Sequence, residues 1–200
     1  MTHLRFAGAA PEEQTAALKD IILSEDWLVE ALHRLDGMRL PDSWIVAGAL
    51  YNMVWNRLTD RPSRHGIKDV DIFYFDDDDL TFEAEDYVIR RAAGVFSDMA
   101  VPAEVRNQAR VHLWFGQHFG FDIEPIADCR DAVSRFSSVA YCVGARLDTA
   151  GDLQITAPYG LDDLFSFRIR PNRYYDNRET HERKAERAVS LWPEVTVEPW

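Results

Sequence analysis

Cysteine is scarce in this chain. Only Cys129 and Cys142 are present, in different segments, and neither belongs to a CxxC pair or to a Cys/His cluster. A disulfide framework or a zinc-binding motif needs more cysteines at closer spacing. The pattern predicts two free thiols in a reducing compartment.

Long apolar runs are also missing. No stretch approaches the roughly 18 apolar residues that read as a membrane span. The first 13 residues, MTHLRFAGAAPEE, contain no apolar core of the kind found in secretory signal peptides. We therefore expect a cytoplasmic protein with no membrane partner.

Positive charge is the third deficit. The chain has 34 acidic and 22 basic residues, a net charge of −12. Broad binding to nucleic acid depends on a basic footprint, so a long nucleic acid is disfavoured as a partner. A triphosphate stays compatible with this charge if metal ions carry the positive charge.

The composition is otherwise that of a globular protein. Hydrophobic residues make up 46% and aromatic residues 12% of the 200 residues. A chain of this length buries roughly 70% of the surface that its unfolded form exposes. No repeat or low-complexity linker interrupts it, so we expect a single domain over residues 1–200.

Hydrophobic periodicity divides that domain into three parts. The ranges are N-terminal helices over about 11–37, a catalytic core over about 43–127 and a C-terminal extension over about 128–200. Within the core we expect strands over 43–47, 68–75 and 103–115, and helices over 49–57 and 82–96. The extension is predicted to hold a hairpin, 139–147 with 153–157, and a final helix over 176–191. This pattern indicates an α/β (α+β) fold with a mixed sheet flanked by helices.

The acidic strand carries the strongest functional signal. In KDVDIFYFD, residues 68–76, Asp69 and Asp71 fall on one face because side chains alternate along a strand. Two carboxylates held side by side repel each other, and a divalent metal ion relieves that repulsion. The sequence therefore predicts a Mg²⁺ or Mn²⁺ site at Asp69 and Asp71.

A turn lies upstream of this strand. In WIVAGA, residues 44–49, an apolar strand is broken at Gly48 and a helix follows. Backbone N–H groups at a helix N-terminus bind phosphate, so Gly48 and Ala49 are candidate ligands of the β- and γ-phosphates. Together the two motifs indicate metal-dependent chemistry on a nucleotide.

Nucleotidyl transfer by two metal ions typically needs about three carboxylates. Glu104 is the preferred third candidate, because it opens the next predicted strand, and Asp122 in FDIEP is the alternative. The third carboxylate is expected to orient or deprotonate the attacking hydroxyl. On this interpretation Asp69, Asp71 and Glu104 are both the metal ligands and the catalytic residues.

At this point the chain resembles a known family. The segments that carry the resemblance are GALYNMVWN, GIKDVDIFYFD, EVRNQARVHLW, APYGLDDLF, RPN and LWPEVTV. They look like the bacterial nucleotidyltransferase-like family, which is assigned to the DNA polymerase beta-type nucleotidyltransferase superfamily. The resemblance extends from about Trp44 to the C-terminus.

The resemblance implies a nucleotidyltransferase-type fold and a metal-dependent transfer of a nucleoside monophosphate from a nucleoside triphosphate to a hydroxyl, with release of pyrophosphate. The superfamily pattern places Gly48 at the glycine position and Asp69 and Asp71 at the metal positions. Two departures stand out: Ala49 replaces a Gly or Ser, and 19 residues separate Ala49 from Asp69. The acceptor could be a small molecule, a protein side chain or an RNA end. Further nucleotide-binding candidates are Asn52, Lys68, Arg106 and Arg110.

Two other functions stay open at this level. The fold could serve as a nucleotide-binding or interaction module without catalysis, an alternative that Ala49 and the uncertain third acid favour. A DxD motif also occurs in glycosyltransferases, where it binds Mn²⁺ and a sugar-nucleotide diphosphate. Those enzymes usually place a βαβ nucleotide-binding unit upstream, whereas the residues before Gly48 read as helical.

Overall fold

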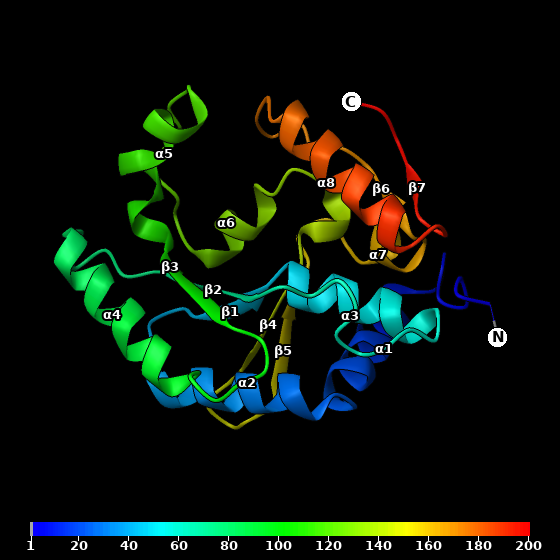
Figure 1. The fold of residues 1–200 in the computed structure, drawn as a ribbon, viewed down its shortest axis with the longest axis horizontal. Helices are drawn as coiled ribbons and strands as arrows, with labels where there is room; N and C mark the ends of the chain where they lie inside the picture. The colour runs from blue at the N-terminus through cyan, green and yellow to red at the C-terminus, as the bar shows by residue number, and fades with distance from the viewer. Residues whose placement is uncertain (1) are drawn as a thin grey trace.

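The structure is a computed structural model that describes residues 2–200. Helices α1 and α2 precede a core in which strands and helices mix (Figure 1). The helices are α1 (Pro11–Leu23), α2 (Asp26–Met38), α3 (Gly48–Leu58), α4 (Phe82–Val95), α5 (Val111–Phe119), α6 (Cys129–Ser134), α7 (Asp162–Phe165) and α8 (Arg178–Leu191). The strands are β1 (Trp44–Val46), β2 (Val70–Tyr74), β3 (Ala103–Asn107), β4 (Gly144–Leu147), β5 (Leu153–Thr156), β6 (Arg168–Ile169) and β7 (Thr196–Val197).

Five strands form the central sheet in the order β3-β2-β1-β4-β5. Strands β2 and β3 run parallel, and the other neighbours are antiparallel, so the sheet is mixed as predicted. The predicted C-terminal hairpin is β4 with β5, and it extends this sheet beside β1. Strands β6 and β7 form a separate two-stranded sheet.

The N-terminal helices form because their apolar residues recur at helical spacing. Helix α1 buries Leu18 and Ile22, and α2 buries Leu28, Leu32 and Leu35, all within the main core. The expected end of these helices at about residue 37 is within one residue of the observed end. Gly37 lies inside α2, and the helix ends at Met38 because Arg39 takes the left-handed conformation, with φ 53°.

The predicted strand over 103–115 is correct only as far as Asn107. Strand β2 ends at Tyr74, which pairs with Asn107, so no ladder partner exists beyond that point. The Asn107 side chain accepts a hydrogen bond from the Ala109 backbone and starts a short 3₁₀ turn, Gln108–Arg110. Helix α5 follows. The alternation of side chains beyond Asn107, which indicated a strand, therefore does not correspond to a strand.

The loop between α3 and β2 accounts for the long spacing between Ala49 and Asp69. Buried Asn56 donates hydrogen bonds to the carbonyls of Ser63 and His65. Its Oδ1 accepts from Trp192 Nε1 at 2.9 Å, which ties the loop to the C-terminal segment. Gly66 then turns the chain toward β2 with φ +73°.

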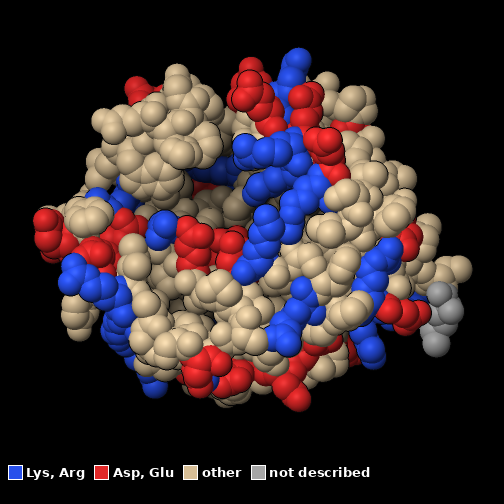
Figure 2. All heavy atoms as spheres, in the orientation of Figure 1, with Lys and Arg blue, Asp and Glu red and all other residues tan. Residues whose placement is uncertain are grey.

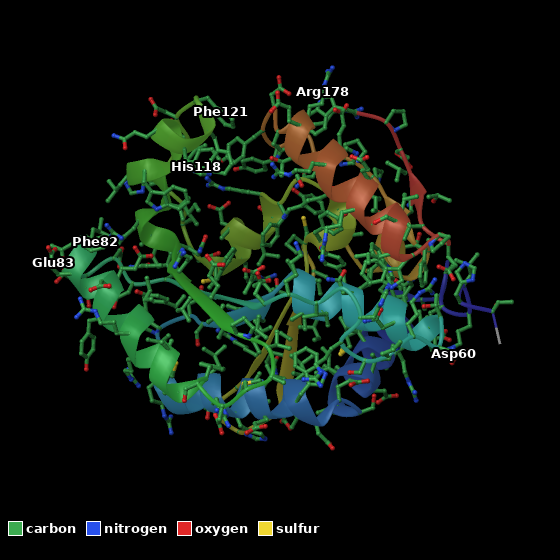
Figure 3. All side chains as sticks on the ribbon, viewed as in Figure 1. Asp60, Phe82, Glu83, His118, Phe121 and Arg178 are labelled. Carbon is green, nitrogen blue, oxygen red and sulfur yellow. The ribbon has the colours of Figure 1, made fainter. Side chains whose placement is uncertain are left out.

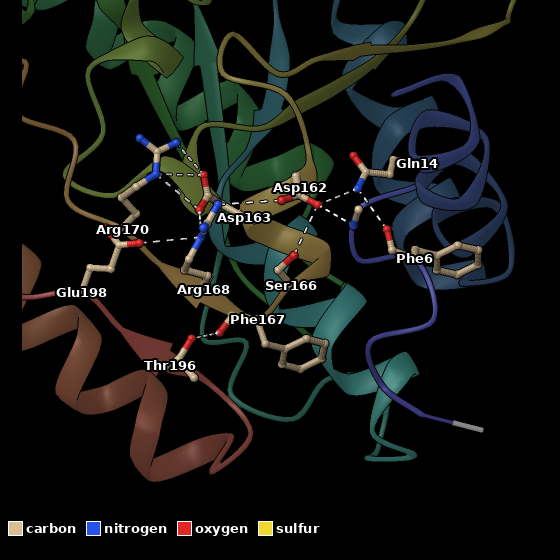
Figure 4. Close-up of polar contacts among 11 residues, drawn as sticks. Phe6, Gln14, Asp162, Asp163, Ser166, Phe167, Arg168, Arg170, Thr196 and Glu198 are labelled. Carbon is tan, nitrogen blue, oxygen red and sulfur yellow. Dashed lines mark hydrogen bonds and ion pairs between the residues drawn. The ribbon is translucent and has the colours of Figure 1, made fainter. Parts of the chain in front are cut away.

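The segment after β5 is held to the N-terminal region by polar contacts (Figure 4). Asp162 accepts from the Gly8 backbone at 2.7 Å and from Gln14 at 3.2 Å. Asp163, which is 4% exposed, accepts from both Arg168 and Arg170. The ion pairs of these two arginines with Asp163 therefore stabilise the fold, and they anchor the chain that leads into α8.

No helix within residues 2–200 is both long enough and apolar enough to cross a membrane. Both cysteines are buried and free, in agreement with the sequence.

Candidate functional site

Asp69 and Asp71 line one cavity of about 230 Å³. Asp69 precedes β2 directly and Asp71 is its second residue, so both emerge at the start of the strand. Val70 and Ile72, which alternate with them, are fully buried in the core. The strand thus presents its carboxylates to the cavity because the side chains on its opposite face pack in the core.

The turn between β1 and α3 forms another wall of the same cavity, through Ala47 and Gly48. Ala47 has φ 49° and ψ −109°, a backbone conformation that costs of order 1–3 kcal/mol for a residue with a Cβ. The first N–H groups of an α-helix have no intrahelical acceptor, so the start of α3 at Gly48 offers donors to an anion.

Asn52, one turn into α3, is 2% exposed and also lines the cavity. Its Oδ1 atom has no hydrogen-bond partner among residues 2–200. A buried amide oxygen without a partner costs free energy, so this atom is a candidate acceptor for a ligand group. Ala49, in contrast, is fully buried in the core and does not reach the cavity.

Helix α8 contributes two cations that the sequence did not single out. Lys184 and Arg187 line the same cavity as Asp69 and Asp71. Arg187 Nη2 donates to the Gly66 carbonyl at 2.7 Å, which fixes the guanidinium at the cavity wall. Their spacing of three residues puts them on one helix face, but only the packing of Ala185 and Ala188 against the core turns that face inward.

Lys68 lines the cavity as well. A regular strand would point it away from Asp69, but β2 begins only at Val70, so the alternation does not extend to Lys68. Its side chain is exposed, as expected for a lysine at the mouth of a polar cavity.

Glu104 is the direct neighbour of Asp71. The parallel register of β2 and β3 pairs Asp71 with Glu104 and Phe73 with Arg106. Glu104 Oε1 accepts from Arg106 Nη2 at 2.7 Å, and both side chains are about half exposed. Of the two candidates for the third acid, Glu104 is therefore the one beside the aspartates. Asp122 lies beyond α5 with its carboxylate against Gly116.

Arg110, a nucleotide-binding candidate from the strand interpretation, lies elsewhere. It is buried as the last residue of the 3₁₀ turn, where it forms an ion pair with Glu85 and donates from Nε to the Leu80 carbonyl at 2.9 Å. The alternation of a long strand would have put it on the face of Glu104, and the end of β3 at Asn107 removes that arrangement. Arg106, still within β3, stays close to Asp71.

Burial and neighbouring charges shift the pKa values of two groups in this cavity. Burial raises the pKa of Asp71 to about 6, and repulsion by Asp69 and Glu104 adds to this shift while Lys184 opposes it. Lys184 keeps exposed surface, yet the surrounding walls desolvate its ammonium group and lower its pKa, although Asp71 and Asp69 act in the other direction. Each charged form is penalised by burial and partly relieved by the opposite charge.

The donor set fits a divalent cation. Carboxylate oxygens are the ligands that Mg²⁺ prefers, and a bound cation relieves the repulsion around Asp71. Within residues 2–200, no three His, Cys, Asp or Glu side chains converge as a complete cage. Mg²⁺ is commonly held by one or two carboxylates together with substrate phosphates, and Asp69 and Asp71 match that requirement.

A second and larger hollow adjoins this cavity. It has a volume of about 810 Å³ and shares Lys184 with the polar cavity. Figure 2 shows the hollow between an uncharged lobe and a band of basic side chains. Its lining is mainly aromatic and apolar: Phe73, Val111, Trp114, Phe115, Phe119, Phe121, Ile123, Ile126, Phe136 and Tyr175. We call it the aromatic cleft.

The mixed sheet, with the acidic pair on β2 beside the turn into α3, defines a protein of the nucleotidyltransferase class. Residues 33–197 match the sequence profile of a family described as Nucleotidyltransferase. The chain belongs to this nucleotidyltransferase family.

The fold is also similar to a solved structure. That structure, determined by NMR and described as revealing a CCA-adding enzyme head domain, aligns with a TM-score of 0.76 and 24% sequence identity. The alignment covers 91% of this chain and 96% of the other. At this identity the likeness establishes the fold. No curated protein matches the chain significantly.

Proposed function

We propose that this protein transfers a nucleoside monophosphate from a nucleoside triphosphate to a hydroxyl acceptor in a reaction that depends on Mg²⁺ or Mn²⁺. One observation carries the proposal. Asp69 and Asp71, the N-terminus of α3, and the cations of α8 all line one cavity. Family membership supports the same class of reaction.

The residues of the cavity bind different parts of the triphosphate. The N–H groups at the start of α3 and the side chains of Lys184 and Arg187 bind the phosphates. Lys68 adds charge at the cavity mouth, and the unpartnered Oδ1 of Asn52 accepts a hydrogen bond from a substrate hydroxyl. Together they hold the triphosphate with its α-phosphorus near the aspartates.

Asp69 and Asp71 would hold the divalent ion, with Glu104 at the side of the acceptor. The ion supplies positive charge that offsets the negative charge on the phosphoryl oxygens. Glu104 accepts the proton of the acceptor hydroxyl. The acceptor oxygen forms a bond to the α-phosphorus, the bond from the α-phosphorus to the bridging oxygen breaks, and pyrophosphate leaves with that electron pair.

Arg106 holds Glu104 through the 2.7 Å contact and stands beside Asp71. An arginine at this position balances the three carboxylates before a metal arrives and orients Glu104 afterwards. We also propose that the protein acts in the cytoplasm, where nucleoside triphosphates and Mg²⁺ are both present.

Calorimetric titration with a non-hydrolysable triphosphate analogue tests the metal site. The double variant Asp69→Asn, Asp71→Asn should bind the analogue at least tenfold more weakly in Mg²⁺ and should lose the difference between Mg²⁺ and EDTA. Asp77→Asn, which changes an exposed acid on the loop after β2, is the matched control and should bind as the wild type does. Unchanged Mg²⁺-dependent affinity in the double variant would refute the proposed site.

A catalytically inactive nucleotide-binding module is the second candidate. Glu104 is engaged by Arg106, and Ala49 offers no hydroxyl to phosphate. Release of pyrophosphate in the presence of mixed hydroxyl acceptors separates the two functions. A transferase releases pyrophosphate and loses this activity in Glu104→Gln, whereas a module binds triphosphate without turnover.

A further inference from the structure

The aromatic cleft continues directly from the polar cavity. Asp71 and Phe73 are alternate residues of β2, so the strand leads from the acidic pair into the cleft on one face. The register repeats this on β3, where Glu104 pairs with Asp71 and Arg106 pairs with Phe73. The cleft therefore begins beside the position that the proposed function gives to the α-phosphorus.

Lys184 stands at the junction of the two spaces. Its ammonium lies 6.0 Å from the ring centre of Phe136 and 5.9 Å from that of Tyr141. Phe136 in turn stacks on Phe73, with ring centres 5.5 Å apart. These rings hold the lysine between the phosphate-binding side and the apolar side.

The outer wall of the cleft consists of aromatic side chains that remain open to solvent. Trp114 is 37% and Phe119 is 45% exposed, and both come from α5. Helix α5 contains no Asp, Glu, Lys or Arg. Figure 3 shows Phe121, just after α5, across the opening from Arg178 at the start of α8. An exposed group of large aromatic residues in a concave site marks a ligand surface.

We propose that the aromatic cleft is the acceptor site and that the acceptor is a small molecule with an aromatic body and a hydroxyl group. The inference rests on the proposed nucleotidyl transfer. The volume of about 810 Å³ is that of a site for a drug-sized molecule. Phe73 and Arg106 line the cleft two residues along β2 and β3 from Asp71 and Glu104, so an acceptor bound there has its hydroxyl near the proposed position of the α-phosphorus.

The charges of the cleft argue against a polynucleotide end as the acceptor. A nucleic acid strand needs cations along its phosphates. The α5 wall offers none. Of the cations elsewhere in the lining, Arg106 is paired with Glu104 and Lys184 is shared with the polar cavity, while Arg178 shares its wall with Asp176 and Glu179. Arg135, also in the lining, is paired with Asp131. The cleft recognises a planar, weakly charged body.

Simultaneous binding tests this assignment without requiring turnover. The probe is 8-anilino-1-naphthalenesulfonate, whose fluorescence rises in an apolar site. We expect one molecule to bind per chain and to remain bound when the polar cavity is saturated with a non-hydrolysable triphosphate analogue and Mg²⁺. If the analogue or adenosine displaces the probe, the cleft is the base site and the inference fails.

The double variant Trp114→Ala, Phe119→Ala locates the probe. It should weaken probe binding at least tenfold and leave the affinity for the triphosphate analogue within twofold of the wild type. Tyr87→Ala, which removes an exposed aromatic ring of α4, is the matched control and should leave both unchanged. Unaltered probe binding in the double variant would overturn the inference, as would displacement of the probe by a short single-stranded RNA.

Binding of the probe and binding of the triphosphate analogue together distinguish a failure of this inference from a failure of the proposed function. If the wild type binds the probe but no triphosphate analogue, the nucleotidyltransferase proposal fails and the cleft is a binding site of another kind. If it binds the analogue with Mg²⁺ but the probe binds outside the cleft, only the acceptor assignment fails.

Discussion

Asp71 on β2 lies directly beside Glu104 on the parallel strand β3. Neighbouring strands are about 4.8 Å apart, so these two carboxylates repel each other wherever both are ionised. Asp69 lines the same cavity as Asp71, so the three carboxylates concentrate negative charge at one end of the sheet. The fold tolerates this charge because Lys184 and Arg106 stand close to it.

The first prediction concerns pH. The folded-state pKa of Asp71 is about 6, above the unfolded value of 3.8, so the folded protein holds this proton more tightly. The stabilising contribution is fully present below about pH 4 and is lost as the pH rises through 6. In metal-free buffer, Asp71→Asn should therefore be more stable than the wild type at pH 7.5, by about 3 kcal/mol.

Urea unfolding at pH 4 and at pH 7.5 measures this difference. The gain of Asp71→Asn over the wild type should be larger at pH 7.5, whereas Asp77→Asn should follow the wild-type profile at both. A parallel pH dependence in Asp71→Asn and the wild type would show that Asp71 titrates normally.

The second prediction concerns the cations of α8. Lys184→Met removes a charge that faces Asp71 and lines both cavities. A charge-assisted hydrogen bond contributes about 1.5–3 kcal/mol, so the dissociation constant of a triphosphate analogue should rise roughly tenfold or more. Calorimetric titration measures it. Arg183→Met, at the neighbouring position of the same helix, should change the dissociation constant far less. Equal effects of the two substitutions would show that the overall charge of the helix matters and not the position of Lys184.

The third prediction is that Arg110 contributes to stability and not to nucleotide binding. Arg110→Met leaves Glu85 buried without its ion-pair partner, which should cost about 3–5 kcal/mol of stability. Affinity for a triphosphate analogue should stay unchanged in the folded fraction. Denaturant unfolding and titration measure the two effects.

Two controls accompany this variant. Arg90→Met breaks an exposed ion pair with Asp86 and should leave stability almost unaltered. Adding Glu85→Gln to Arg110→Met removes the orphaned charge and should recover part of the loss. A large drop in nucleotide affinity in Arg110→Met would return this residue to the site.

The fourth prediction concerns Gly66. A Cβ at this position would lie 2.6 Å from Cη2 of buried Trp192, and φ is +73°. Gly66→Ala should lower stability by about 2 kcal/mol or more, from backbone strain and overpacking together. Gly151→Ala is the control, because Gly151 has φ +85° but open space around it, so only the strain of about 1 kcal/mol applies. Thermal unfolding of both variants measures the steric part, and equal losses would exclude it.

Much of the fold followed from local patterns. The helices near both ends, the strands β1 and β2 and the β4–β5 hairpin were predictable because hydrophobic periodicity and turn residues act over a few neighbours. The strand interpretation of 103–115 failed beyond Asn107, since the end of a strand depends on the length of its partner, here β2. That error placed Arg110 on the wrong surface.

The sequence by itself determined the acidic pair and the turn before Gly48, because spacing along a short segment sets the face of each side chain. The family followed from the same short motifs taken together. Only the tertiary structure decided which residues meet that pair. The register of β2 and β3 brought Glu104 beside Asp71, and the packing of α8 brought Lys184 and Arg187 from more than 100 residues away in the chain. Such contacts depend on how buried surfaces fit together, which no local spacing encodes.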